Sequence, residues 1–178
     1  MRRILLPVLA VFAAQAAGQG NAQKSDWELE QERRDWKETQ VKLPAFPKAD
    51  GLVEFFVSSA TSFRFFIDAA SIAVEPDGVV RYTMVARSPS GVANVSYEGI
   101  RCENASYRVF ALGNDGSWVA MQQSEWRRIE VKSIQRWHNE LYSRYFCPNR
   151  GLISSAAEGV IALRRGGHPS ILNAERSR

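Results

Sequence analysis

The residues of this chain best suited to binding a ligand are arginines and aromatics on predicted β-strands. They are Arg81, Arg87, Tyr97, Glu98, Arg101, Trp126 and Arg127. A guanidinium group donates paired hydrogen bonds to carboxylates or phosphates and stacks on aromatic rings. This set therefore predicts a surface that binds an anionic ligand or another protein. The alternative is a charged outer sheet face without a specific ligand, which is the common arrangement on half-exposed strands.

Carboxylates on the same strands raise a second hypothesis, the hydrolysis of envelope glycans or peptidoglycan. Glycosidases use two carboxyl groups separated by roughly 5–10 Å, one as the acid and the other as nucleophile or base. Glu98 and Glu125 are the candidates for these roles. The competing interpretation is that such strand acids face solvent and pair with arginines on neighbouring strands. We expect the solvent-facing arrangement and keep the hydrolase as the alternative function.

Metal and nucleophile chemistry find little support in the sequence. The only histidines are His138 and His168, and nothing matches the ligand spacing of a zinc site. We expect His138 to be an ordinary surface or packing residue of a helix, since no partner can be identified for it. No nucleophile elbow, phosphate loop or dinucleotide fingerprint is present. The sequence therefore predicts no metal, no cofactor and a non-enzymatic module.

The N-terminus has the three parts of a secretory signal peptide, residues 1–22. Arg2 and Arg3 form its positive region, residues 4–14 are apolar, and small residues then allow cleavage after Ala22 or Ala16. The apolar run is short for a membrane span, so an uncleaved anchor is the less favoured alternative. We expect a soluble periplasmic protein, not integral to a membrane, whose partner is an envelope protein or an anionic ligand.

Charge argues against nucleic acid as a partner. The sequence has 23 basic and 19 acidic residues, and removal of Arg2 and Arg3 with the signal leaves 21 basic residues against the same 19 acidic ones. Proteins that bind nucleic acid through their phosphates carry a much larger basic excess or a basic cluster. No nucleic-acid binding is therefore expected.

Cys102 and Cys147 are the only cysteines. In an oxidising compartment two lone cysteines of one domain usually pair, so we predict a structural disulfide. A free buried thiol and a redox pair are the alternatives, although a redox pair normally has Cys-x-x-Cys spacing.

Alternating apolar residues predict an antiparallel sheet from residue 51 onward. The plainest strand is 80–86, where every second residue is apolar, and it follows a turn signal at residues 75–78. A slip in the apolar phase at Gly99 predicts a β-bulge.

The C-terminal part is predicted to be helical. Trp137, Leu141 and Tyr145 recur at helical spacing, and residues 155–158 form a capping box that opens another helix. The fold class is therefore α+β: an antiparallel β-sheet with C-terminal helices packed on one face and one disulfide. This domain is assigned to residues 51–166. Residues 23–50 are expected to be a charged N-terminal arm with a proline linker, and residues 167–178 a flexible tail.

Three sequence runs carry a family resemblance. They are Asp77-Gly78-Val79-Val80-Arg81-Tyr82, Ala86-Arg87-Ser88-Pro89-Ser90-Gly91 and Asn94-Val95-Ser96-Tyr97-Glu98-Gly99-Ile100-Arg101-Cys102. Together with residues 124–127 and 141–148, they resemble the cryptic neisserial protein one-like family over roughly residues 36–150. The resemblance implies an exported protein of Gram-negative bacteria. It carries over no catalytic or binding residue, so it supports the predicted compartment and leaves the function open.

Overall fold

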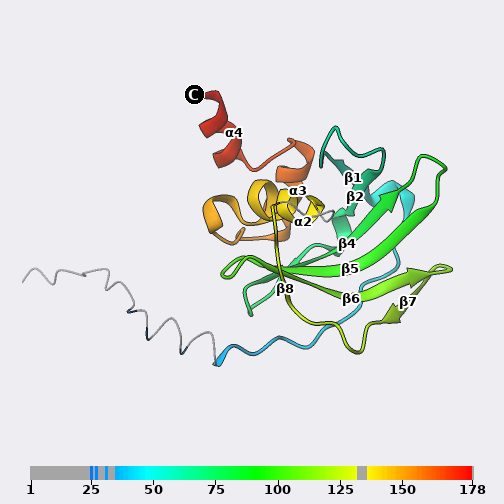
Figure 1. Cartoon of the computed structure of the whole chain (residues 1–178), viewed down its shortest axis with the longest axis horizontal. Coiled ribbons are helices and arrows are strands. Elements are labelled where there is room, and N and C mark those ends of the chain that lie inside the picture. The colour runs from blue at the N-terminus through cyan, green and yellow to red at the C-terminus, as the bar shows by residue number, and fades with distance from the viewer. Residues whose placement is uncertain (1–24, 26, 28–30, 32–34, 132–135, 178) are drawn as a thin grey trace, which may run out of the picture. The chain divides into compact units, whose positions relative to one another are not determined.

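The computed structural model of the chain describes residues 25, 27, 31, 35–131 and 136–177 (Figure 1). Residues 37–178 form one compact unit, and the residues before them belong to a separate one. The predicted signal peptide and residues 23–24, 26, 28–30 and 32–34 of the predicted N-terminal arm lie outside the described residues.

The unit is built on an antiparallel sheet (Figure 1). Six strands neighbour one another in the order β1 (Leu52–Phe55), β2 (Arg64–Asp68), β4 (Val79–Arg87), β5 (Ala93–Arg101), β6 (Ser106–Asn114) and β7 (Ser117–Ala120). Two short strands complete it: β3 (Ala73–Val74) pairs with β4, and β8 (Arg127–Arg128) pairs with β6. The predicted turn before β4 is present, and Gly78 there has a φ of 77°, a conformation that glycine adopts without steric cost. The predicted antiparallel sheet is confirmed.

Helical segments follow the sheet in the chain and cover one of its faces. They are α2 (Arg136–Glu140), the π-helix η3 (Leu141–Phe146), the 3-10 helix η4 (Pro148–Arg150), α3 (Ala156–Arg164) and α4 (Pro169–Arg176). Short 3-10 turns also occur at η1 (Ala49–Gly51) and η2 (Ala69–Ser71). The apolar residues of β4 that alternate from Val80 pack against Leu141, Tyr145 and Phe146 in the main core. The predicted helix-on-sheet arrangement is confirmed.

A disulfide joins the two layers. Cys102 follows β5 directly and bonds to Cys147 at the end of η3, with 5.5 Å between their Cα atoms. Both side chains are buried. The two cysteines are 45 residues apart in the sequence. Closing a loop of that length stabilises the fold by about 4 kcal/mol on the chain-entropy model. The predicted pairing is confirmed.

The opposite face of the sheet is covered by an extended segment, residues 37–48, which we call the strap. Val41 packs against a second apolar cluster that contains Tyr97 and Phe110. Phe46 packs on Trp118 with 5.1 Å between ring centroids, and the Trp118 indole N–H donates to the carbonyl of Pro44 at 2.9 Å. Residues 37–48, predicted to be part of an arm and linker that precede the domain, therefore belong to the folded unit.

The C-terminal residues expected to form a flexible tail instead include α4. His168 caps this helix by accepting from the backbone N–H of Ser170, and Pro169 occupies the first turn, where its missing N–H costs nothing. Arg144 of η3 holds the segment in place through Glu175, at 2.5 Å, and through the carbonyl of Gly166. Side-chain capping and an ion pair, rather than an apolar stripe, order this stretch.

Candidate ligand-binding groove

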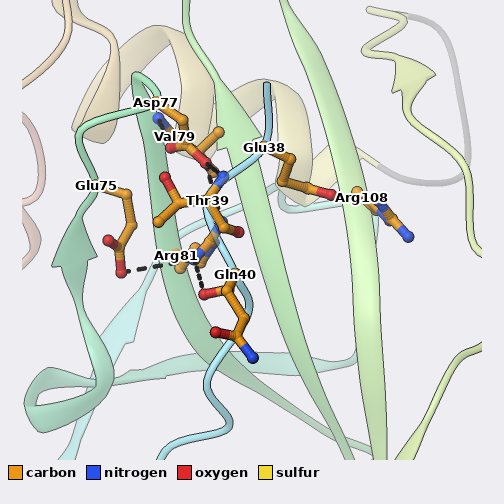
Figure 2. Close-up of polar contacts among 8 residues, drawn as sticks. All are labelled: Glu38, Thr39, Gln40, Glu75, Asp77, Val79, Arg81 and Arg108. Atoms are coloured by element: carbon orange, nitrogen blue, oxygen red, sulfur yellow. Dashed lines mark hydrogen bonds and ion pairs between the residues drawn. The ribbon is translucent and has the colours of Figure 1, made fainter. Parts of the chain in front are cut away.

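Arg81 is the anchor of the strap and not an exposed binding residue. Figure 2 shows its side chain reaching from β4 to the strap, where it donates to the carbonyls of Thr39 at 2.8 Å and Gln40 at 3.4 Å. It also pairs with Asp77 at 3.0 Å and lies 3.6 Å from Glu75. Asp77 in turn accepts the backbone N–H of Thr39 at 2.8 Å. With 1% of its surface exposed, Arg81 has no face left for a ligand.

A second arginine reinforces the same contact. Arg108 of β6 forms an ion pair with Glu38 of the strap at 2.5 Å (Figure 2). The guanidinium groups of Arg81 and Arg108 each lie 5.4 Å from the centroid of the Phe110 ring, within range of a cation–π interaction. These basic residues on this face therefore hold the strap on the sheet.

The other predicted binding residues on this face are also engaged or covered. Tyr97 is 3% exposed and lies beneath the strap beside Trp118. Arg101 is 6% exposed and pairs with Glu103, while Arg87 is half-buried with its guanidinium 5.0 Å above the ring of Phe66. The described residues therefore show no open face of arginines here: the strap covers Arg81 and Tyr97, and Arg87 and Arg101 contact neighbouring side chains of their own.

Trp126 and Arg127 lie at the edge of the sheet, near β6. Trp126 is half-buried and meets Phe110 edge-on at 6.1 Å, whereas Arg127 is exposed on β8. Glu98 lies on the other face, toward the helices. The structure thus distributes the predicted set over two faces and one edge and does not bring it together as one site.

Glu98 is the centre of a buried polar cluster, so the expectation of a solvent-facing carboxylate was wrong. It is 2% exposed and accepts hydrogen bonds from the hydroxyls of Ser96 at 2.6 Å and Tyr82 at 3.0 Å. His138 Nε2 lies 2.9 Å from the same carboxylate. The reason is register: β5 places Glu98 directly opposite Tyr82, whose side chain is in the main core.

These contacts determine the charge of the cluster. Burial raises the pKa of the Glu98 carboxyl, but the neighbouring His138 and the hydrogen bonds from His138, Ser96 and Tyr82 outweigh it, so this pKa lies below its ordinary value of 4.5. Burial and the nearby Glu98 raise the pKa of the Tyr82 hydroxyl well above its ordinary value. Glu98 is therefore an ionised carboxylate at neutral pH, and Tyr82 keeps its proton.

His138 reaches this cluster from α2. Its ring is 2% exposed and stacks on Tyr107 with 3.6 Å between ring centroids. Its Nδ1 atom has no hydrogen-bond partner among the described residues. The sequence offered no partner for His138, whereas the structure supplies Glu98 from a strand forty residues earlier. His138 therefore both packs against Tyr107 and contacts the Glu98 carboxylate.

A hollow opens directly above Glu98. This central hollow, of about 450 Å³, has a mostly apolar wall made by β2, β4, β5, β6 and α2. Its lining residues are Thr61, Phe63, Phe65, Met84, Ala86, Asn94, Val95, Ser96, Glu98, Val109, Leu112 and Trp137. Phe63 and Leu112 remain 38% and 45% exposed on its rim. Volumes of roughly 300–1,000 Å³ with apolar walls and a few polar groups are typical of small-ligand sites.

Two further hollows adjoin it and share its lining residues. The loop end, of about 490 Å³, shares Thr61, Phe63, Phe65 and Trp137 and extends to Ser58, Ser62 and Arg136. The β8 end, of about 220 Å³, shares Glu98, Val109, Leu112 and Trp137 and extends to Met121, Glu125, Arg127 and His138. We call the three together the groove. Trp137 lines every part of it, and Glu98 lies where the central hollow meets the β8 end.

The family model described as the CNP1-like family matches residues 31–164. The chain belongs to the CNP1-like family. It is 28% identical over 153 residues to Cryptic neisserial protein 1 of Neisseria gonorrhoeae (strain ATCC 700825 / FA 1090), an alignment that covers 72% of this chain and 75% of that relative. No solved structure matches the chain. The sequence resemblance to this family is thereby confirmed.

Two further findings bear on this CNP1-like chain. Within the described residues, none of the helices is long and apolar enough to cross a membrane. No cluster of three or more histidine, cysteine, aspartate or glutamate side chains in the described part of the chain could hold a metal ion.

Proposed function

We propose that this protein is an exported, non-enzymatic binding module of the bacterial cell envelope that holds a small amphiphile in the groove. The observation that carries the proposal is the central hollow, whose aromatic and aliphatic wall is open at the surface and has a buried, ionised carboxylate at its base. An apolar middle with polar ends matches a ligand with an apolar body and a polar group. After export, the signal is removed behind Ala22 or Ala16, and the protein works in the periplasm.

The Glu98 cluster supports this role because it is costly to maintain. A buried ion needs several hydrogen bonds to offset its lost hydration, and apolar replacements of similar volume often give equal or greater stability. Strand and helix residues supply those bonds here, and the carboxylate lies at the junction of two hollows. A polar group placed this way is available to orient a ligand in the groove.

The alternative function is an envelope glycan or peptidoglycan hydrolase, and one observation favours it: Glu98 and Glu125 line the same β8 end. The lowered pKa of Glu98 argues against it as the proton donor, since a general acid needs a raised pKa. Glu125 would have to be the acid and Glu98 the nucleophile or base. Glu98 already accepts three hydrogen bonds, which weaken a nucleophile, so the binding module is the better-supported function. Release of reducing sugar from peptidoglycan that is lost in Glu125→Gln would favour the hydrolase instead.

Binding is tested with a neutral apolar fluorophore, N-phenylnaphthylamine, whose emission rises in an apolar site. Leu112→Lys places a charge on the rim of the groove and should weaken binding about tenfold, because burying an unpaired charge beside the fluorophore is unfavourable. Ile161→Lys is the matched control, since Leu112 and Ile161 are 45% and 46% exposed and Ile161 lies on α3, outside the groove. Equal affinities for the two variants would contradict a site in the groove.

Export is tested by fractionation and intact mass. The protein recovered from the periplasm should begin at residue 23 or 17 and have a mass two hydrogens below that of the reduced chain, because the disulfide is formed. A cytosolic protein that retains Arg2 and Arg3 would contradict the proposed compartment.

A further inference from the structure

We infer that the ligand is an anionic single-chain amphiphile, whose head group binds at the loop end beside Arg136 and whose chain runs past Trp137 toward Leu112. This inference rests on the proposed function and specifies its ligand. It follows from the unequal distribution of charge between the two ends of the groove.

The loop end is suited to an anion. Arg136, the first residue of α2, lines it and is exposed. Its acidic neighbour Glu140, one turn further along α2, interacts with it electrostatically but does not line this end. Its guanidinium makes one long contact, 3.3 Å, with the hydroxyl of Ser58. No acidic residue occurs among the described residues that line this end. An arginine with unused donors at the mouth of an apolar hollow favours a carboxylate or phosphate.

Two hydroxyl groups that line the loop end with Arg136 add further hydrogen-bond donors for an anion. Ser58 Oγ accepts the backbone N–H of Ala60, and Thr61 Oγ1 accepts that of Phe63. Each hydroxyl uses an oxygen lone pair in this way, so its O–H hydrogen is left to donate. The loop between β1 and β2 therefore presents two oriented hydroxyls next to a guanidinium.

The β8 end disfavours an anion. The ionised Glu98 and the carboxylate of Glu125 line it. Arg127 lines it too, so this end carries both signs of charge, whereas no acidic residue is among the described residues that line the loop end. A negative head group is consequently more stable at the loop end, and this difference gives the ligand one orientation.

The wall between the two ends accommodates an extended chain. The central hollow crosses β2, β4, β5 and β6, which at about 4.8 Å per strand is roughly 14 Å. Phe65, Trp137, Met84, Val109 and Leu112 line this path, and Met121 continues it. The length and the apolar wall suit a medium-length acyl chain.

The test is displacement of N-phenylnaphthylamine by dodecyl amphiphiles below their micelle concentrations. Dodecanoate and dodecylphosphate supply anions from two sources, and dodecyltrimethylammonium is the matched cation. At least one of the two anions should displace the fluorophore at a concentration about fivefold lower, or lower still, than the concentration of the cation that is needed. A fivefold difference in affinity is the effect expected of one partly exposed ion pair. The stronger anion identifies the head group as carboxylate or phosphate.

Variants then locate the head group. Arg136→Gln should weaken the preferred anion about fivefold and leave the affinity for the neutral fluorophore unchanged. Arg164→Gln, a substitution of an exposed arginine of α3 that lines no part of the groove, should change neither. No preference for anions, or equal losses in Arg136→Gln and Arg164→Gln, would overturn the inference while leaving the proposed function intact. Failure of the fluorophore itself to respond to Leu112→Lys would overturn the proposed function.

Discussion

Arg81 and Glu98 are charged residues buried on opposite faces of the sheet, and their surroundings differ. Arg81 lies between the sheet and the strap. Its partners are two backbone carbonyls of the strap and the nearby acid Asp77. Glu98 lies between the sheet and α2, and its partners are side chains from β4, β5 and α2. Of the two, Glu98 lines the groove. A buried charge whose surroundings are all protein fastens a segment, whereas one beside a hollow is available to a ligand.

The largest expected effect comes from removing the strap anchor. Arg81→Met leaves Asp77 buried without its cation and two strap carbonyls without their donor, so the free energy of unfolding should fall by about 3–5 kcal/mol. Urea denaturation measures this loss. Hydrogen exchange of the strap, residues 37–48, should rise in the same variant. Unchanged exchange there would show that Arg81 does not hold the strap.

A smaller effect is expected from Glu98→Gln, which keeps the shape of the side chain. It removes the negative charge that His138, Tyr82 and Ser96 contact, and should lower the free energy of unfolding by about 1–3 kcal/mol. Hydrogen exchange of the strap should remain as in the wild type, since the cluster lies on the other face. Faster exchange in residues 37–48 would contradict the separation of the two faces.

The pH dependence of Glu98→Gln sharpens the assignment of its charge. Because the folded-state pKa of Glu98 is below the unfolded value of 4.5, its stabilising contribution is fully present above about pH 4.5 and is lost as pH falls through the folded-state pKa. The stability difference between wild type and Glu98→Gln should thus shrink as pH falls from about 4.5 toward 3. A difference that grows over this range would mean that Glu98 is protonated in the folded protein.

The smallest effect is expected at Arg87. Its side chain lies on the strap-side face, half-buried over Phe66, and no ion pair to it is found among the described residues. Arg87→Gln should change the free energy of unfolding by less than about 1 kcal/mol, the usual range of an exposed cation–π contact. A loss as large as that of Arg81→Met would show that the two arginines of this face act as one unit.

Much of this architecture is predictable because local sequence patterns specify the individual strands, turns and helices. The alternating run at residues 80–86, the turn at residues 75–78 and the helical spacing from Trp137 to Tyr145 each report their own element. The pairing of Cys102 with Cys147 follows from their number and the expected compartment. These signals do not depend on which residues meet across the fold.

The strap and α4 were not predicted, for different reasons. The strap is held by its backbone carbonyls and by Arg81, so residues 37–48 need no apolar periodicity of their own. The α4 helix is specified by the His168 cap and by Pro169, signals that were available in the sequence.

The inward position of Glu98 was also within reach. Strands β4 and β5 are joined by a short turn, and the register that this turn imposes places Glu98 opposite Tyr82. Since Tyr82 belongs to the apolar face of β4, its partner must point the same way. The register shift between β5 and β6 occurs between Tyr97 and Glu98, close to the bulge predicted at Gly99. The groove itself requires the packing of α2 over four strands, which no local pattern reports.

The proposal that the groove binds a ligand is tested most directly by the indole N–H signals of two tryptophans in a nitrogen-15 NMR titration. Trp137 lines the groove, while Trp118 donates its indole N–H to Pro44 beneath the strap on the opposite face. Each signal is assigned with a Trp→Phe variant, and dodecanoate is then added below its micelle concentration. The account predicts a saturable shift of the Trp137 signal with Trp118 unmoved. A shift at Trp118 alone, or none at Trp137, would contradict it.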